Sequence, residues 1–222
     1  MPLSFDYRPP TEPWLNIVYE DERLIVLDKP SGLLTVPGKD AALADCLETR
    51  VQTRYPQYPR TKVVHRLDKD TSGLLLMAFD KSALGYLGSQ FESRRTEKTY
   101  VARVWGAMEG DGGLIDLPLA TDWENRPRQR VDFDNGRPSQ TAWQVIGRED
   151  GATRLRLTPL TGRTHQLRVH LMAEGHPILG DPFYATGAAL SAADRLQLHA
   201  EALAFFHPHD HRRMSLVSPA PF

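Results

Sequence analysis

The 222-residue chain has 41% hydrophobic and 25% charged residues, which is the balance of a soluble globular protein rather than a disordered one. No apolar run approaches the roughly 18 residues of a membrane span, and the start MPLSFDYRPP lacks the basic and apolar regions of a signal peptide. A single cysteine, Cys46, excludes an internal disulfide and a cysteine-built metal cage, so we expect a cytoplasmic protein.

Hydrophobic patterning predicts more strands than helices along the chain. Strands are predicted at residues 24–27, 74–79, 98–106, 140–146, 153–160, 196–203 and 214–218, and helices at 41–55, 81–91 and 163–175. The stretch RPPTEP, residues 8–13, predicts an irregular start. Because the strands are often adjacent, the pattern predicts an α+β fold with a largely antiparallel sheet.

The charges are distributed unevenly, although the formal net charge is only −1. Residues 1–48 carry 4 Lys/Arg against 9 Asp/Glu, so the remainder has an excess of basic groups. Arginines gather at 94–98, 125–130 and 154–168, and arginine suits bidentate phosphate recognition. On charge alone we favour ordinary solvated faces, with a nucleic-acid partner as the alternative.

Several common active-site patterns do not occur in the sequence. It contains neither a Walker sequence nor a G-x-G-x-x-G loop. His165 and His170 are five residues apart, so they do not share one helix face as a zinc-binding pair would. We interpret the tract HPHDH, residues 207–211, as a surface loop rather than a metal site. The single DTSG, residues 70–73, lacks the second copy that an aspartic protease needs.

Asp68 lies in the segment HRLDKDTSG, residues 65–73, directly before an apolar run. A carboxylate in such a place can be a structural ion pair, a metal ligand or a nucleophile, and spacing alone favours the ion pair. Arg163, at a predicted loop-to-helix junction, could reach a distant carboxylate, and if paired with Asp68 it would keep that carboxylate ionised at neutral pH by lowering its pKa. Tyr100, two residues after a lysine, offers a flat ring for stacking a base and a phenolic proton.

Six segments together carry a resemblance to a known family. They are DKPSGLLTVPG (28–38), HRLDKDTSGLLL (65–76), EKTYVARVWG (97–106), PLTGRTHQLRVHL (159–171), GHPILGDPFY (175–184) and LQLHAEAL (196–203). A lone D-x-x-T-S-G would be a weak signal, but this ordered set spans nearly the whole chain. The chain therefore resembles the RluA family of pseudouridine synthases, in its short, dual-specificity type.

The resemblance implies roles for residues at the matching positions. Asp68 falls on the family's catalytic aspartate, Tyr100 on its active-site tyrosine, and Arg163 on the arginine that pairs with the aspartate. Arg66 falls on the arginine that helps to turn the target uridine out of its stack. The family uses no metal or organic cofactor, so we expect none.

The resemblance also implies a fold and a domain organisation. The family fold is a mixed, mainly antiparallel sheet in two subdomains with flanking helices and a central active-site cleft. Residues 1–22 would be an acidic, proline-rich lead-in, and residues 23–222 a single catalytic domain. We expect no separate S4-like RNA-binding domain of the kind that larger members carry, because the lead-in is too short to hold one.

Other residues have a plainer reading beside the functional one. His65 is grouped with the base-flipping residues, although we favour a hydrogen-bonded support for the turn over a catalyst. Leu76 would pack under the uracil or simply belong to the core. We expect Trp105, Trp123 and Trp143 in the core or at subdomain contacts rather than as base-stacking platforms.

The resemblance implies structured RNA as the partner, namely a 23S rRNA stem-loop and the anticodon stem-loop of tRNA, bound by a monomer without membrane or metal. The target base must leave its stack before a carboxylate can reach ribose C1′ or the uracil ring; removal of the C2′ proton is a third route. Two other classes stay open. One is a catalytically idle RNA-binding or chaperone protein on the same fold, and the other is a metal-dependent RNA hydrolase built on the histidines.

Overall fold

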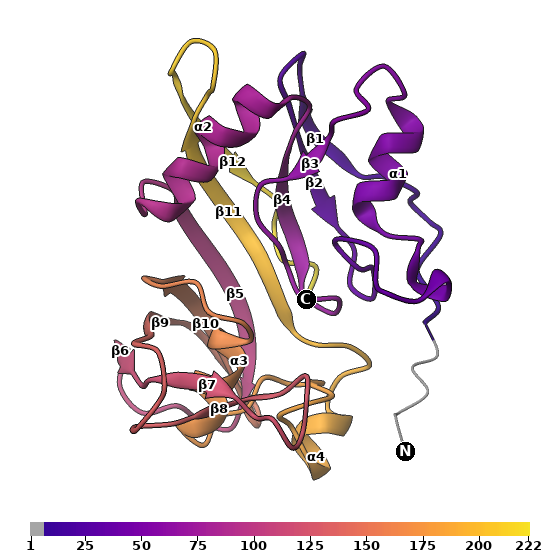
Figure 1. Cartoon of the computed structure of the whole chain (residues 1–222). Helices are drawn as coiled ribbons and strands as arrows, with labels where there is room; N and C mark the ends of the chain where they lie inside the picture. The colour runs from indigo at the N-terminus through magenta and orange to yellow at the C-terminus, as the bar shows by residue number, and fades with distance from the viewer. Residues whose placement is uncertain (1–6) are drawn as a thin grey trace. The chain divides into compact units, whose positions relative to one another are not determined.

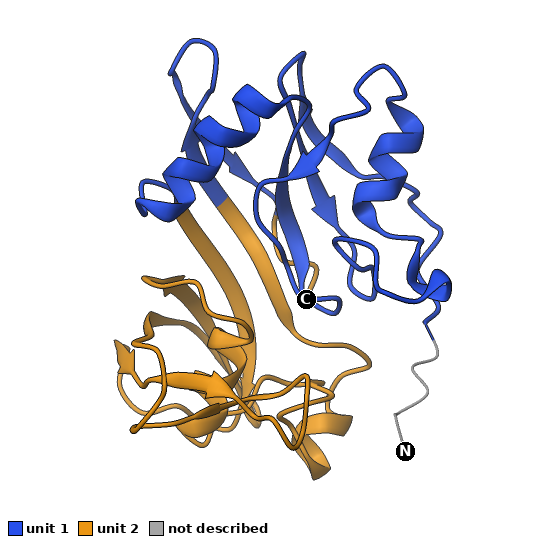
Figure 2. Cartoon of the chain, viewed as in Figure 1, with its two compact units in different colours: residues 1–96, 203–218 blue, residues 97–202, 219–222 orange. Residues whose placement is uncertain are grey.

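The computed structural model describes residues 7–222, which divide into two compact units (Figure 2). Unit 1 comprises residues up to 96 together with 203–218, and unit 2 comprises residues 97–202 and 219–222. Most of the strand pairs are antiparallel, and the helices are few. The predicted α+β class with a mainly antiparallel sheet is therefore confirmed.

In unit 1 the strands lie in the order β1, β2, β4, β11, with β3 also paired to β4 and β12 to β11 (Figure 1). The strands are β1 Ile17–Glu20, β2 Leu24–Lys29, β3 Lys62–Val63, β4 Ser72–Ala78, β11 Leu198–Phe206 and β12 Arg213–Val217. Only residues 203–206 of β11 belong to this unit. The helices are the 3₁₀ turn η1 Ala41–Leu43, α1 Leu47–Arg54 and α2 Lys81–Glu92.

The core of unit 1 forms around β4, whose seven residues SGLLLMA are all buried. Its register sets Leu24 of β2 opposite Ala78. Helix α2 begins where the side chain of Asp80 accepts a hydrogen bond from Ala83 N at 2.9 Å, which satisfies one of the unpaired amides of the first turn. The buried cluster contains Leu24, Val26, Leu74, Leu76, Ala78, Ala83, Leu87, Leu203, Phe205 and Met214.

In unit 2 the strands lie in the order β11, β5, β10, β9, β6, and β7 and β8 form a separate hairpin (Figure 1). The bounds are β5 Glu97–Trp105, β6 Gly112–Asp116, β7 Leu119–Thr121, β8 Gln129–Val131, β9 Gln140–Glu149, β10 Ala152–Pro159, α3 Gln166–Ala173 and α4 Gly187–Ser191. None of the helices in residues 7–222 is long and apolar enough to cross a membrane.

The alternation along β5 gives unit 2 its core. Ala102 and Val104 are fully buried in a cluster with residues of β10 and α3, and Tyr100 packs against the same cluster. This confirms that Tyr100, Ala102 and Val104 share one face of the strand. The tyrosine predicted to be functional therefore stands at the edge of a packed core rather than on a mobile loop.

The structure departs from the predicted elements at particular residues. The predicted helix 41–55 is divided because Cys46 caps a new helix, in which Cys46 N donates to Thr49 Oγ1 at 3.1 Å. The predicted helix 163–175 begins only after His165, whose φ of 53° is left-handed. Strands β1, β3, β6, β7 and β8 and helix α4 were not predicted.

A buried ion pair joins α3 to the segment that follows it in unit 2. Arg168 Nε lies 2.8 Å from Asp181 Oδ2 and Arg168 Nη2 lies 2.7 Å from Asp181 Oδ1. The same Oδ1 accepts a hydrogen bond from Phe183 N at 2.9 Å. Both charged side chains are almost fully buried, so removal of one leaves the other without its counterion.

We expect Asp181→Asn to lower the free energy of unfolding by about 3–5 kcal/mol, because it leaves a buried guanidinium without a countercharge. Urea denaturation measures this. The matched control is Glu149→Gln, which removes a carboxylate that pairs with Arg103 and Arg154 near the surface of the same unit and should cost less than about 1 kcal/mol. Equal costs for the two variants would contradict the assignment.

Candidate active site

Asp68 lies in the loop of residues 64–71, which joins β3 to β4 in unit 1. The side chain of Asp68 is half-buried, and that of Arg66 is exposed. Thr71 N donates to Asp68 O at 3.2 Å, which closes a turn directly before β4. The carboxylate is therefore set at the mouth of a fully buried strand, as the sequence indicated.

The ammonium group of Lys29 ties this loop to the turn after β2. Lys29 has no exposed surface, and its Nζ donates to three backbone carbonyls, Pro30 O at 2.9 Å, Leu33 O at 2.8 Å and Lys69 O at 2.9 Å. An ammonium has three N–H donors and no acceptor, so three carbonyls satisfy it completely. One of the three belongs to the residue next to Asp68.

Further hydrogen bonds hold the two segments together on both sides of Asp68. Thr35 Oγ1 donates to Leu67 O at 2.6 Å, and Ser31 Oγ donates to Asp70 O at 2.7 Å. Gly32 N donates to Lys69 O at 2.9 Å, and its φ of 87° is one that side chains rarely adopt. The backbone carbonyls of the residues flanking Asp68 are thus all bound to the turn at 30–35.

Burial lowers the pKa of Lys29 to about 7, and the nearby carboxylates of Asp70 and Asp68 act in the opposite direction. Lys29 is therefore coupled to Asp68 in two ways, electrostatically and through its hydrogen bond to the backbone of Lys69. This residue was not among those singled out from the sequence.

His65 holds the start of the loop to β4. Its Nε2 accepts a hydrogen bond from Leu76 N at 3.2 Å, and its ring stacks on Phe91 with the ring centroids 4.6 Å apart. Because Nε2 accepts this hydrogen bond, it carries no proton of its own. The ring proton is then on Nδ1, and the ring is not an imidazolium. Leu76 itself is fully buried in the core of unit 1. These contacts show that His65 and Leu76 support the fold of unit 1. A role for His65 or Leu76 in base flipping stays a prediction.

Tyr100 and Arg163 both belong to unit 2. Tyr100 lies opposite Leu157 in the β5–β10 pair, close to the end of β10 at Pro159. The loop that follows carries Arg163, and a Cβ built on the neighbouring Gly162 would lie 4.0 Å from Lys98 Nζ. The start of β5 and the Arg163 loop are therefore neighbours.

The electrostatics of this region follow from its burial. Burial lowers the pKa of Lys98. Arg163 is half-buried, and its Nε is buried without a hydrogen-bond partner among residues 7–222. A buried donor left unpaired costs about 1–3 kcal/mol.

The side chain of Gln166 organises the Arg163 loop. Its Oε1 accepts from Thr161 Oγ1 at 2.7 Å and from Arg163 N at 3.0 Å. Its Nε2 donates to Gln140 O at 2.9 Å and to Thr141 Oγ1 at 3.0 Å. The amide is buried with both of its ends bonded, so it fixes the backbone of Arg163 against the start of β9.

The histidine tract at residues 207–211 belongs to unit 1. The histidine tract forms the turn between β11 and β12, where His209 and His211 are exposed and His207 Nε2 lies 2.8 Å from Asp21 Oδ2. Within residues 7–222 no three His, Cys, Asp or Glu side chains gather in a way that would hold a metal ion. The tract is thus a surface turn, as expected.

The tryptophan predictions are partly wrong. Trp143 packs against the core of unit 2, as expected. Trp123 and Trp105 are 69% and 38% exposed. Trp123 is exposed because it lies in the loop beyond the short β7–β8 hairpin, which has no core of its own, and Trp105 is the last residue of its strand.

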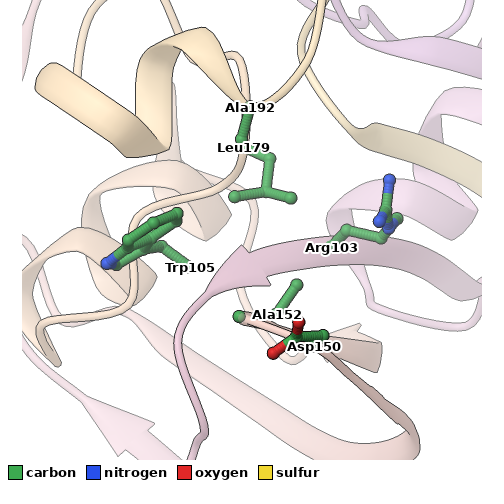
Figure 3. Close-up of a pocket in the computed structure, with 7 residues that line it drawn as sticks. Arg103, Trp105, Asp150, Ala152, Leu179 and Ala192 are labelled. Atoms are coloured by element: carbon green, nitrogen blue, oxygen red, sulfur yellow. The ribbon is translucent and has the colours of Figure 1, made fainter.

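Unit 2 also contains a cavity of about 300 Å³ (Figure 3). It is lined by Arg103, Trp105, Asp150, Gly151, Ala152, Leu179 and Ala192. None of the six residues predicted for the site lines it. We therefore build the candidate site on the Asp68 and Arg163 loops and not on this cavity.

Comparison with known proteins agrees with this arrangement of motifs. Residues 23–173 match the family model described as RNA pseudouridylate synthase. The chain belongs to the RNA pseudouridylate synthase family. The "Dual-specificity RNA pseudouridine synthase RluA" of Vibrio vulnificus is 52% identical over 98% of this chain and 88% of its own length. The protein of the same name from Escherichia coli K12 is 49% identical over 98% of both.

A solved structure shows the same fold. "Human RNA Pseudouridylate Synthase Domain Containing 1" is similar with a TM-score of 0.77 and 31% identity, over 94% of this chain and 84% of that one. The pseudouridylate synthase fold is therefore present together with the ordered motifs of the family.

The predicted residues fall into two groups within this pseudouridylate synthase. Asp68, Arg66 and His65 share one loop of unit 1, whereas Tyr100 and Arg163 are neighbours in unit 2. The pairing of Asp68 with Arg163 stays a prediction. Sequence reasoning did not select the two organising residues, Lys29 and Gln166. The signal that could have pointed to Lys29 is its place at the end of an apolar strand, directly before Pro-Ser-Gly.

We expect Lys29→Met to destabilise the synthase because three carbonyls lose their donor. The folded pKa of about 7 lies below the ordinary value of 10.5, so between these pH values the unfolded chain holds a proton that the folded chain has lost. The contribution of Lys29 to stability therefore rises with pH over this range. Urea denaturation should show a larger difference between wild type and Lys29→Met at pH 9 than at pH 7.

The control is Lys39→Met, which removes an exposed lysine from the same unit and should change little at either pH. A difference between wild type and Lys29→Met that stays constant or shrinks as the pH rises would refute the lowered pKa.

We expect Gln166→Leu to free the backbone of the Arg163 loop, because leucine cannot bond any of the four partner groups. The unfolding free energy should fall by about 1–3 kcal/mol, and the amide of Arg163 should exchange with deuterium faster. Hydrogen exchange measured by NMR checks this. The control Gln144→Leu alters an exposed side chain of β9, and unchanged exchange at Arg163 in both variants would count against the assignment.

Proposed function

We propose that this chain isomerises uridine to pseudouridine in structured RNA, with Asp68 as the catalytic carboxylate. The observation that carries the proposal is the segment HRLD, residues 65–68, on a loop whose backbone is fixed by Lys29. The chain matches proteins named RNA pseudouridine synthase over nearly its full length.

The reaction needs only a positioned carboxylate and a place for the base to turn. The bond from ribose C1′ to uracil N1 breaks, the uracil rotates, and C1′ joins C5. The C5 proton is released and N1 takes up a proton, so the product is an isomer of the substrate. No oxidant, phosphate donor or second substrate takes part. Asp68 would act at C1′, at the uracil ring, or by taking the C2′ proton.

The other site residues would hold the reacting groups. Arg66 is exposed on the same loop and would occupy the space that the extruded uridine leaves. Tyr100, fixed by its strand, would carry the uracil ring on its face. The half-buried guanidinium of Arg163, with its unbonded Nε, would keep the carboxylate of Asp68 ionised and oriented.

We propose that the substrates are a stem-loop of 23S rRNA and the anticodon stem-loop of tRNA. The relatives named dual-specificity support two RNA classes. Unpaired nucleotides in loops are also the easiest to extrude, because little stacking and pairing energy is lost. We propose further that the enzyme acts as a monomer in the cytoplasm.

The test is tritium release from C5-labelled uridine in transcribed tRNA and 23S rRNA fragments, with a chelator present. Wild type should release tritium. Asp68→Asn should lower the rate by roughly 10³-fold or more, since the reacting carboxylate is lost, while it still binds the RNA. The control Asp70→Asn changes a carboxylate of the same turn, which pairs with Lys69, and should keep most of the activity.

Three outcomes would count against the proposal. Binding without tritium release by wild type would favour an idle RNA-binding protein. RNA that is shortened when the chelator is left out, and stays intact when it is present, would favour a metal-dependent hydrolase. Full activity of Asp68→Asn would remove Asp68 from the chemistry.

A further inference from the structure

The loop of residues 122–128, between β7 and β8, presents a tryptophan whose ring is held by an arginine. Trp123 is 69% exposed, and Cζ of Arg126 lies 3.5 Å from the centroid of its ring. A guanidinium at this distance covers one face of the ring and limits its rotation. Most of the ring surface is left open to a second flat partner.

The carboxylates around this loop are used within its own turns. Asp122 Oδ2 accepts from Asn125 Nδ2 at 2.9 Å, and this bond lowers the pKa of Asp122. Asp132 Oδ1 accepts from Asn135 N at 2.9 Å, and its other oxygen lies 3.0 Å from Arg130. Asp122 and Asp132 therefore act as turn formers, and Trp123 stays 69% exposed beside them.

The arginines of the loop tip remain available. Arg126 and Arg128 are exposed and form no ion pair with residues 7–222. Residues 122–134 nevertheless contain four carboxylates and only three arginines, so the region is not a strongly positive patch. Any ligand of this loop must be bound chiefly through the aromatic ring.

A hydrogen-bonded relay attaches the loop to the segment that carries Arg163. Gln129 N, at the start of β8, donates to Tyr184 OH at 2.8 Å. The same phenolic oxygen lies 2.7 Å from His165 Nδ1, and His165 is two residues after Arg163. The loop thus has a fixed attachment to the candidate site within unit 2.

From these contacts we propose that Trp123, held by Arg126, is a stacking platform for an unpaired nucleotide of the RNA substrate, at a place distinct from the reacting uridine. The inference rests on the proposed function, because it assigns a further contact to the same RNA. Stacking of a base on an aromatic side chain contributes about 1–3 kcal/mol. The nearby arginines would contact the phosphate beside that base.

The platform explains why an apolar ring is kept exposed at the tip of a hairpin. A protein partner would require an apolar surface around the ring, whereas the residues next to Trp123 in the sequence are Asp122, Glu124 and Asn125. A nucleobase needs only one flat face, and its phosphate suits the free guanidiniums. The chemistry of the loop therefore fits a single nucleotide better than a protein surface.

The experiment compares wild type, Trp123→Leu and Trp123→Phe in binding a fluorescently labelled, transcribed anticodon stem-loop. Trp123→Leu should raise Kd about tenfold, which corresponds to the loss of one stacked base. Trp123→Phe keeps an aromatic face and should restore most of the affinity. In tritium-release assays KM should rise with Kd while kcat stays unchanged, because the loop does not touch the reacting atoms.

The matched control is Trp14→Leu, since Trp14 of unit 1 is 45% exposed and has Arg50 at 4.3 Å from its ring. It should bind the stem-loop as wild type does. A blunt duplex made from the same stem, which offers no unpaired base, should bind wild type and Trp123→Leu equally. Equal Kd values of wild type and Trp123→Leu for the stem-loop would overturn the proposal.

The two proposals can fail separately. If wild type releases tritium and Trp123→Leu binds the stem-loop normally, the platform is wrong and the proposed function stands. If wild type binds the stem-loop through Trp123 but releases no tritium, the platform stands and the isomerase activity is wrong.

Discussion

A fully buried ammonium group must find three acceptors, and Lys29 finds them in the backbone of two segments that are far apart in the sequence. The cost of burying its charge is offset only while all three carbonyls stay in place. This requirement fixes the turn at 30–35 against residues 67–70, and with them the backbone that carries Asp68. The position of the carboxylate proposed to be catalytic therefore depends on a residue that need not touch the substrate.

Unit 2 fixes its own loop with a neutral amide. Gln166 bonds both ends of its side chain to the residues around Arg163, and this side chain does not titrate. His165 then links this loop through Tyr184 to the β7–β8 hairpin. In both units a buried polar side chain on a regular element holds the loop that carries the proposed site residues, so that the loop is ordered before any ligand binds.

The sequence predicted the elements that have strong periodicity and missed the parts that depend on contacts distant along the chain. The alternation around Tyr100 and the apolar run of β4 were sufficient for the core strands. The strands β7 and β8 have three residues each, too few for any periodicity. Asp68 could be selected as a candidate because its motif is ordered with five others. Lys29 and Gln166 bond mostly backbone groups, which leave no pattern in the sequence. Trp123 was expected in the core or at a subdomain contact, because the sequence around it does not reveal that the β7–β8 hairpin has no core of its own.

The most direct test of the account is a crystal structure of the Asp68→Asn variant bound to the anticodon stem-loop. The account predicts that the target uridine is extruded, with its ribose beside residue 68, its ring on Tyr100 and the Arg163 guanidinium close to both. It would be contradicted by a complex in which that uridine stays stacked in the RNA, or in which residue 68 and Arg163 contact different nucleotides.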